Sequence, residues 1–287
     1  MSARHALLPV RTLIVTETPA LQRLRELPPE YRVRPVEGWA ELGAAMDQAP
    51  PSATVLADPY LGRRPADGPS PELRRLIARR PSVPVIAAIP MRGDLVGDMA
   101  TLLEWEVSDV LNLYVQRSAN AVRECLRGAR ARPLKRKVEP LLTTYASENA
   151  RKVVRAACEV AVEGGAAPEL AAIFQVDPRT VTAWCRREGL PPPRRLLAWT
   201  RVLLAAMMLK EHGRSIVNVA RSAGYATDHA LRRAMRDLAA GDPSTVPRGE
   251  LFDRAAARFR NDIRDVRDRA RERRRDTRGG GPQSPPG

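Results

Sequence analysis

Arginine side chains gather on the predicted outer faces of two short basic stretches, residues 178–187 and 228–237. In the first stretch, Arg179, Thr182 and Arg186 recur at intervals of three and four residues, which places them on one face of a helix. A guanidinium group can bind a phosphate, or the edge of a guanine through two parallel hydrogen bonds. The pattern therefore predicts two surfaces that bind anions or base edges. The alternative for each residue taken alone is a solvated surface charge.

Each basic stretch ends a pattern that occurs twice: a short apolar helix, a tight turn and a more basic helix. The two copies cover Glu169–Gly189 and Ser215–Asp237. In the first, Asp177 before a proline predicts the cap of the second helix. In the second, a glycine permits the turn, and the cap is either Thr227 or Asp228. This is the outline of a helix-turn-helix motif, present twice.

The segment between the copies, RRLLAWTRVLLAAMMLK, has an apolar stripe typical of a buried helix. The stripe consists of Leu197, Val202, Ala205, Met208 and Leu209. Prolines precede the segment and Gly213 follows it, so the pattern predicts one helix with defined ends. A single rigid helix here would hold the two motifs at a fixed separation.

The stretch from Pro168 to Pro243 resembles the DNA-binding domain of the AraC/XylS family of bacterial transcription regulators, in which a linker helix joins two helix-turn-helix units. The resemblance rests on the order and spacing of Ala171, Gly189 with the prolines after it, Arg201, Ala205, Leu209, Ile216, Ala220, Gly224-Tyr225 and Gly241-Asp242-Pro243. The chain departs from the family at Leu231 and Met235, where aromatic residues are usual. The resemblance implies an all-α C-terminal domain that binds DNA.

By this resemblance, the outward side chains of the second helix of each motif contact DNA. The implied DNA-binding residues are Arg179, Thr182, Ala183, Arg186, Asp228, His229, Arg232, Arg233 and Arg236. Ala183 offers only an apolar contact, for instance to a thymine methyl, whereas Arg186 and Arg236 are better placed for phosphates. The two helices are expected to enter successive major grooves about 34 Å apart. Double-stranded DNA is the expected partner, RNA polymerase is a further candidate, and no cofactor is expected.

In the first 130 residues, short β-branched runs alternate with helical stretches. The candidate strands are Arg11–Thr16, Tyr31–Val36, Ala53–Ala57, Val83–Ile89 and Asp109–Tyr114, and the candidate helices are Leu21–Leu27, Trp39–Gln48, Pro71–Arg79, Leu95–Trp105 and Ser118–Arg130. Right-handed crossovers between parallel strands place helices on both faces of a sheet. The sequence therefore predicts a multidomain protein, with a doubly wound, five-stranded parallel α/β domain in front of the all-α domain.

The order and length of this α/β domain resemble the receiver domain of two-component response regulators, and some AraC-type regulators carry such a domain. The resemblance implies an acidic pair after the first strand, a phosphoacceptor aspartate after the third, a hydroxyl after the fourth and a lysine after the fifth. Asp58 occupies the phosphorylation position. However, Glu17 is the only acid after the first strand, Ala88 stands in place of the hydroxyl, and the lysine is missing. We therefore interpret Asp58 as a loop or capping residue, in a receiver-like domain that works without phosphorylation.

The predicted organisation is a receiver-like domain at residues 1–130, a basic linker at 131–138, the DNA-binding domain at 139–249, a charged amphipathic helix at 250–277 and a disordered tail at 278–287. A helix from about Glu139 to Val162 is expected to open the DNA-binding domain. Of the net charge of +15, residues 131–249 contribute +9, with 20 Lys and Arg against 11 Asp and Glu. That excess favours a polyanionic partner.

The terminal helix has an apolar stripe from Phe252 to Ala270, in steps of three and four residues. Such a stripe either packs on the preceding domain or pairs with a second copy of the helix. The sequence therefore leaves open whether the protein forms a homodimer, through this helix or through the N-terminal domain.

Other classes of function find less support. The cysteines Cys125, Cys158 and Cys185 lack metal-ligand spacing and are predicted to be small buried residues, which counts against an alkyl-accepting DNA-repair enzyme. No apolar run reaches the roughly 20 residues that span a bilayer, and no cleavage site of a signal peptide is recognisable, so we expect a cytoplasmic protein. The sequence predicts a non-enzymatic, sequence-specific transcription regulator. The alternative is an interaction or architectural protein that binds DNA without reading its sequence.

Overall fold

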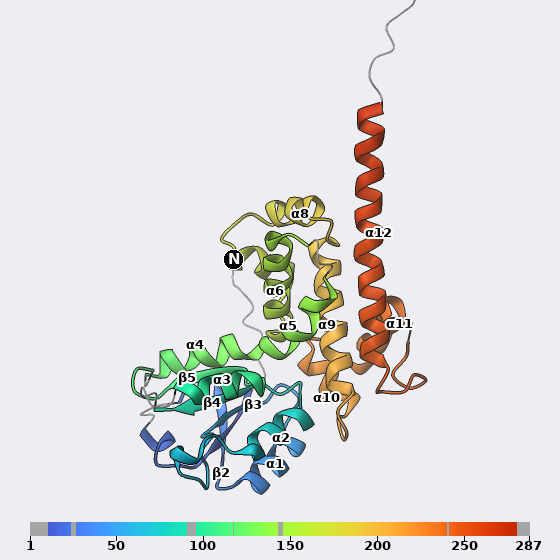
Figure 1. Ribbon diagram of the computed structural model, residues 1–287. Helices are drawn as coiled ribbons and strands as arrows, with labels where there is room; N and C mark the ends of the chain where they lie inside the picture. The colour runs from blue at the N-terminus through green and yellow to red at the C-terminus, as the bar shows by residue number, and fades with distance from the viewer. Residues whose placement is uncertain are drawn as a thin grey trace, which may run out of the picture. The chain divides into compact units, whose positions relative to one another are not determined.

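The computed structural model describes residues 11–23, 27–90, 96–116, 118–142, 146–239 and 241–279 (Figure 1). Its contacts divide the chain into two compact units. The first unit contains the chain up to Leu134 together with Glu211–Ser222, and the second contains Lys135–Lys210 and the chain from Ala223 onward. A short segment between two C-terminal helices thus belongs to the N-terminal unit.

The first unit is built on a parallel sheet of five strands in the order β2-β1-β3-β4-β5. The strands are β1 (Arg11–Thr16), β2 (Tyr31–Val36), β3 (Thr54–Ala57), β4 (Val85–Ile89) and β5 (Asp109–Asn112). This is one of the two common orders of doubly wound sheets. Pro35 is tolerated within β2 because this strand lies at the edge of the sheet and pairs only with β1.

Helices cover both faces of the sheet, as the alternating pattern predicts. They are η1 (Leu21–Arg23), α1 (Trp39–Gln48), η2 (Pro65–Asp67), α2 (Pro71–Arg79), α3 (Val96–Glu104) and α4 (Ala119–Arg130). Side chains of α1 and α2 pack with Ile14 and Val55 on one face, whereas those of α4 pack with Leu13 and Leu56 on the other. The predicted fold class is confirmed. The predicted helices at 21–27 and 95–105 include residues 24–26 and Leu95, which lie outside the described residues.

The remaining elements are helical. They are α5 (Arg132–Val138), η4 (Glu139–Leu141), α6 (Glu148–Val162), α7 (Ala167–Ile173), α8 (Pro178–Arg187), α9 (Pro193–Leu209), α10 (Ile216–Ser222), α11 (Asp228–Ala239) and α12 (Leu251–Gly279). The expected helix from Glu139 is wrong at its start. Pro140 limits that region to a short 3-10 helix, Leu142 has an extended backbone, and the hydroxyl of Ser147 caps α6 by accepting from a backbone N–H.

Helix α9 is the centre of the second unit. It contacts α6, α7, α8, α11 and α12, and most of its side chains are buried. The apolar stripe of α12 supplies Ala255, Phe259 and Ile263 to this core, so the first half of α12 packs on the domain. The predicted disordered tail, apart from the helical residues 278 and 279, lies outside the described residues.

A buried ion cluster anchors the segment before α10 in the first unit. The carboxylate of Glu211 accepts from the backbone N–H of Ser82 at 2.8 Å and from Nε of Arg214 at 3.0 Å. Arg214 also donates to the carbonyl oxygen of Ala49 at 2.7 Å, and Arg80 donates to that of His212 at 2.7 Å. Because Glu211, Arg214 and Arg80 are all buried, these bonds replace the hydration that the charges lose.

Candidate nucleic-acid interface

The first helix-turn-helix motif consists of α7 and α8. Its turn includes Gln175, whose φ of 55° lies in the left-handed region. The carboxylate of Asp177 accepts from the backbone N–H of Arg179 at 2.7 Å, which caps α8, and Pro178 follows as its first residue. The predicted turn and cap are both present. The inner face of α8 is fixed by buried Val181 and Cys185.

The outer face of α8 carries all four of the side chains that the sequence places there. Arg179, Thr182, Ala183 and Arg186 are exposed. The hydroxyl of Thr182 donates to the carbonyl oxygen of Pro178 at 3.0 Å, so the oxygen lone pairs and the methyl group remain available to a ligand. This face can therefore offer two guanidinium groups, one hydroxyl acceptor and two methyl groups to the edges of bases.

The second motif consists of α10 and α11. Gly224 has a φ of 78° in the turn between them. The hydroxyl oxygen of Thr227 accepts from the backbone N–H of Ala230 at 3.1 Å, so Thr227, of the two candidates, caps α11. Leu231 and Met235 are fully buried and occupy the positions where the family usually has aromatic residues.

On the outer face of α11, unlike that of α8, two arginines form ion pairs with an acid outside the helix. Asp242, in the loop after α11, binds Arg232 at 3.1 Å and Arg236 at 2.7 Å. Hydrogen bonds from the Ser244 hydroxyl and backbone N–H, followed by that from Arg236, hold the pKa of the Asp242 carboxyl well below its ordinary value. Arg232 is mostly covered, whereas the side chain of Arg233 is 76% exposed. His229 is exposed as well.

Arg201 of α9 binds the turn before the first motif and lies close to the turn of the second. Its guanidinium donates to the carbonyl oxygen of Gly164 at 3.2 Å and to that of Gly165, in the turn before α7. A Cβ added to Gly224 would lie 3.1 Å from Cα of Gly164 and 3.4 Å from Nε of Arg201, so only glycine fits there without displacement. Tyr225 follows Gly224, and burial raises the pKa of its hydroxyl to about 12.

Two acids with structural roles were missed by sequence reasoning. Asp242 was noted only as part of a Gly-Asp-Pro match, although that position next to a basic helix was a usable signal. Asp262 of α12 gave no signal, because it lies in a run of alternating Arg and Asp. Its buried carboxylate accepts from Nε of Arg195 at 2.8 Å and from Nε1 of Trp199 at 2.7 Å. It thereby fastens α12 to α9.

A family model described as a helix-turn-helix domain matches residues 170–248, from α7 to the loop after α11. The match supports an AraC-type helix-turn-helix domain at residues 170–248. Such a domain binds DNA and regulates transcription, and it is not an enzyme family. The match covers both motifs and the linker helix, whereas α12 lies beyond it. In comparisons with curated proteins and with solved structures, nothing matched the chain.

Asp58, the candidate phosphoacceptor, is buried at the end of β3. Its carboxylate accepts from the backbone N–H of Tyr60 at 2.9 Å, and its own N–H donates to the hydroxyl of Thr16 at 2.9 Å. Burial, more than any other factor, raises the pKa of this carboxyl. The described residues hold no group of three or more His, Cys, Asp or Glu placed to bind a metal ion. The role of Asp58, and the receiver-like character of the unit, stay predictions.

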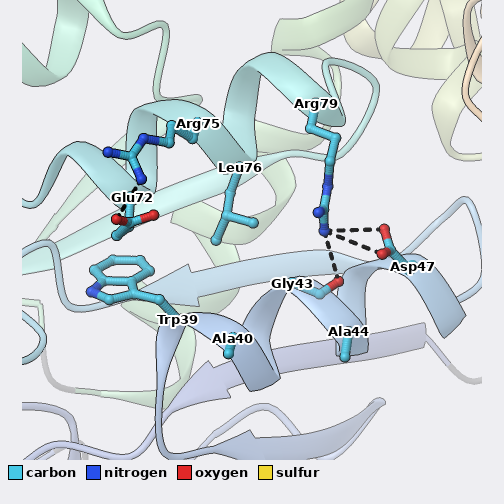
Figure 2. A pocket seen from close by; sticks show the side chains of 9 residues that line it. All are labelled: Trp39, Ala40, Gly43, Ala44, Asp47, Glu72, Arg75, Leu76 and Arg79. Atoms are coloured by element: carbon cyan, nitrogen blue, oxygen red, sulfur yellow. Dashed lines mark hydrogen bonds and ion pairs between the residues drawn. The ribbon is translucent and has the colours of Figure 1, made fainter.

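A groove of about 750 Å³ lies between α1 and α2 of the first unit (Figure 2). Figure 2 shows Arg79 reaching across it to the carboxylate of Asp47 and the carbonyl of Gly43, while Arg75 pairs with Glu72. The groove is therefore framed by matched charges rather than by a surplus of one sign. Asp47 also binds Arg80 at 2.7 Å, which connects the groove to the ion cluster before α10.

The three cysteines are buried, as predicted. Burial raises the pKa of the Cys125 and Cys185 thiols to about 12, and it raises that of Cys158 as well. A thiol that stays protonated is a poor nucleophile, which argues against the alkyl-transfer enzyme considered above. Among the described helices, none has the length and apolar character required to cross a membrane.

Proposed function

We propose that this chain is a sequence-specific transcription regulator of the AraC type, which inserts α8 and α11 into successive major grooves of one duplex. The observation that carries the proposal is the matched domain, in which two solvent-facing basic helices are joined by one buried helix. Arg201 binds the turn before α7 to that helix and lies close to Gly224 in the turn of the second motif, which favours a fixed separation of roughly 34 Å, one turn of DNA.

The exposure of individual side chains supports a separation into residues that contact bases and residues that contact phosphates. Arg179 and Thr182 of α8, with Ala183 beside them, are assigned to base edges. In α11 the exposed His229 and Arg233 are assigned to bases. Arg232 and Arg236 are assigned to phosphates, because Asp242 restricts their reach. Asp228 is close enough to Arg232, at 3.6 Å, to orient it rather than to read a base itself.

Control by the N-terminal α/β domain, without phosphorylation, is the second part of the proposal. It is supported by the membership of α10 in the same compact unit as the sheet and by the buried bonds of Glu211, Arg214 and Arg80. Through Asp47, the same cluster meets the groove between α1 and α2. A small ligand or partner that changed the Asp47 contacts would thereby act on the start of α10. A homodimer and a contact with RNA polymerase stay predictions from the sequence.

The deciding experiment is selection of bound sequences from random duplex DNA with the purified full chain, at two salt concentrations. Enrichment of two short blocks about one helical turn apart is the expected result. The ion pairs on α11 favour the alternative, an architectural protein that binds DNA without readout. Salt-sensitive binding with no enriched sequence would establish that alternative. Absence of binding to any duplex would refute both.

A further inference from the structure

A groove of about 490 Å³ lies between the outer face of α8 and the terminal helix α12. Its rim carries Thr182 and Arg186 from α8, Arg195 from α9 and Arg269 from α12. The first two belong to the face assigned to DNA, whereas α12 follows the matched domain, which ends at residue 248. The groove therefore joins a predicted DNA-binding face to a helix without an assigned role.

Helix α12 is fixed firmly enough to take part in a built site. Asp262 is buried and accepts three hydrogen bonds, two from Arg195 at 2.8 and 3.0 Å and one from Trp199 at 2.7 Å. The indole of Trp199 also packs on the ring of Phe259, with 5.6 Å between the ring centroids. A satisfied buried carboxylate and an aromatic pair together determine the position of α12 on α9.

The end of α8 is fitted closely to α12. Gly189, two residues after the end of α8, is buried and has a φ of 67°. A Cβ at this position would overlap Cγ of Arg267, so the aliphatic part of that arginine packs on the backbone where α8 ends. The spacing between α8 and α12 is thus set by direct contact, and the groove between them has a defined width.

The charge in the groove is positive. Among the residues that line it, Asp262 is the one acid, and its carboxylate is already paired with Arg195. Arg186 and Arg269 therefore supply an excess of positive charge, and both are exposed. Nε of Arg269 donates to the carbonyl oxygen of Asp265 at 3.0 Å, which orients its guanidinium. Arg269 is thus held toward the groove, and Arg186 lies across from it on the face of α8 that is assigned to DNA, where a backbone phosphate beside an inserted helix would pass.

We propose that α12 is a third DNA-contacting element, and that Arg269 together with Arg186 binds a backbone phosphate in the groove between α8 and α12. This proposal rests on the proposed function, because α8 must lie in a major groove for a phosphate to reach the site. It assigns α12 a role in affinity, uniform over sequences, while α8 and α11 read the bases.

The test compares Arg269→Gln with Arg264→Gln in the full chain. Both variants remove one positive charge from an exposed position of α12, but Arg264 lies on roughly the opposite side of the helix and does not line the groove. The dissociation constant is measured at several salt concentrations, on the selected duplex and on a random duplex of equal length. For Arg269→Gln the slope of log Kd against log salt should fall by about 0.9, equally on both duplexes.

Two further variants complete the design. Arg269→Lys should keep the wild-type slope, because a phosphate accepts an ammonium in place of a guanidinium. Asp262→Asn, which weakens the attachment of α12, should reduce the slope as Arg269→Gln does. Thermal unfolding of each variant verifies that the chain is folded.

The outcomes separate this proposal from the function on which it rests. If the wild type binds a selected site but Arg269→Gln behaves like Arg264→Gln, the phosphate site is wrong and the regulator stands. If Arg269→Gln binds more tightly than the wild type, α12 obstructs α8, and the proposal is overturned. If the wild type binds no duplex, both proposals fail together.

Discussion

The two helix-turn-helix motifs differ in how firmly other side chains hold their arginines. In the first motif, Arg179 and Arg186 point into solvent, and neither forms an ion pair with another described residue. In the second, Asp242 binds both Arg232 and Arg236 before any ligand arrives. The arginines of α8 keep rotamer freedom that they must lose on binding, whereas those of α11 have already lost part of it. We therefore expect α8 to adapt to its site and α11 to present a preformed surface.

The first helices of the motifs differ as well. Helix α7 packs on α6, α8 and α9, all of which belong to its own unit. Helix α10 instead belongs to the unit of the parallel sheet, where Glu211 and Arg214 anchor the residues before it. Two motifs with the same outline thus have different supports. We expect the second motif to respond to changes in the α/β domain and the first to be insensitive to them.

The largest expected effect that tests this difference is the loss of Glu211. Replacing it with alanine leaves Arg214 buried without its carboxylate, so Glu211→Ala should lower the free energy of unfolding by about 3–5 kcal/mol. The matched variant in the first motif is Glu169→Ala, which removes an exposed acceptor for the N–H of Ala166 and should cost about 1 kcal/mol. Urea unfolding followed by circular dichroism measures both. Similar losses would show that the two motifs are supported alike.

DNA discrimination should separate two neighbouring arginines of α11. Arg233→Ala should reduce the preference for the selected duplex over a random one by about 1–3 kcal/mol, with unchanged stability, because its side chain is exposed. Arg232→Ala should instead weaken binding to both duplexes equally and lower stability, because Asp242 loses a partner. Competition binding on the two duplexes distinguishes these patterns. If Arg232→Ala lost only the preference for the selected duplex, with no uniform loss of binding, Asp242 would not restrict the Arg232 side chain.

Acid should break the ion pairs that Asp242 forms with Arg232 and Arg236 of α11. The pKa of Asp242 is lowered in the folded chain from an ordinary value of 3.8, so the stability that its charge contributes is present above about pH 4 and is lost as pH falls through the folded value. Asp242→Asn should cost about 1–2 kcal/mol near neutral pH, given its partial exposure, and this difference should shrink below about pH 4. Unfolding curves from pH 7 to 2 measure it. Ser244→Ala, which removes the largest cause of the shift, should move the loss to higher pH.

Most of the fold was predictable from local patterns. Strands β1 and β2 and helices α1 and α2 have the predicted limits, because buried strands and amphipathic helices leave strong periodic signals. The error at Glu139 arose because the apolar positions that predicted this helix begin only at Val153, and they do not show whether Pro140 or Ser147 marks its start.

The candidate site was predictable where it depends on neighbours in sequence. The tight turn between α7 and α8 and the cap at Asp177 are local and were predicted. The pairing of Asp262 with Arg195 joins residues 67 apart, and that of Glu211 with Ser82 joins residues 129 apart. Such contacts leave no periodic signal, because only tertiary packing brings the partners together. For the same reason, the ion pair between Arg232 and Asp242 could not be derived from the position of Arg232 on the helix.

The smallest expected effect concerns the caps, in which the two motifs should be alike. Asp177→Ala removes the acceptor for the N–H of Arg179, and Thr227→Ala removes that for the N–H of Ala230, so each should cost about 1 kcal/mol. Asp228→Ala should cost less than Thr227→Ala, because Asp228 acts only through the helix dipole and a 3.6 Å pair with Arg232. Thermal unfolding of the three variants under one buffer condition measures the order. Equal losses for the two caps would place the difference between the motifs in their tertiary partners. A much larger loss of stability for Thr227→Ala than for Asp177→Ala would mean that the motifs differ in the stability of α11 itself.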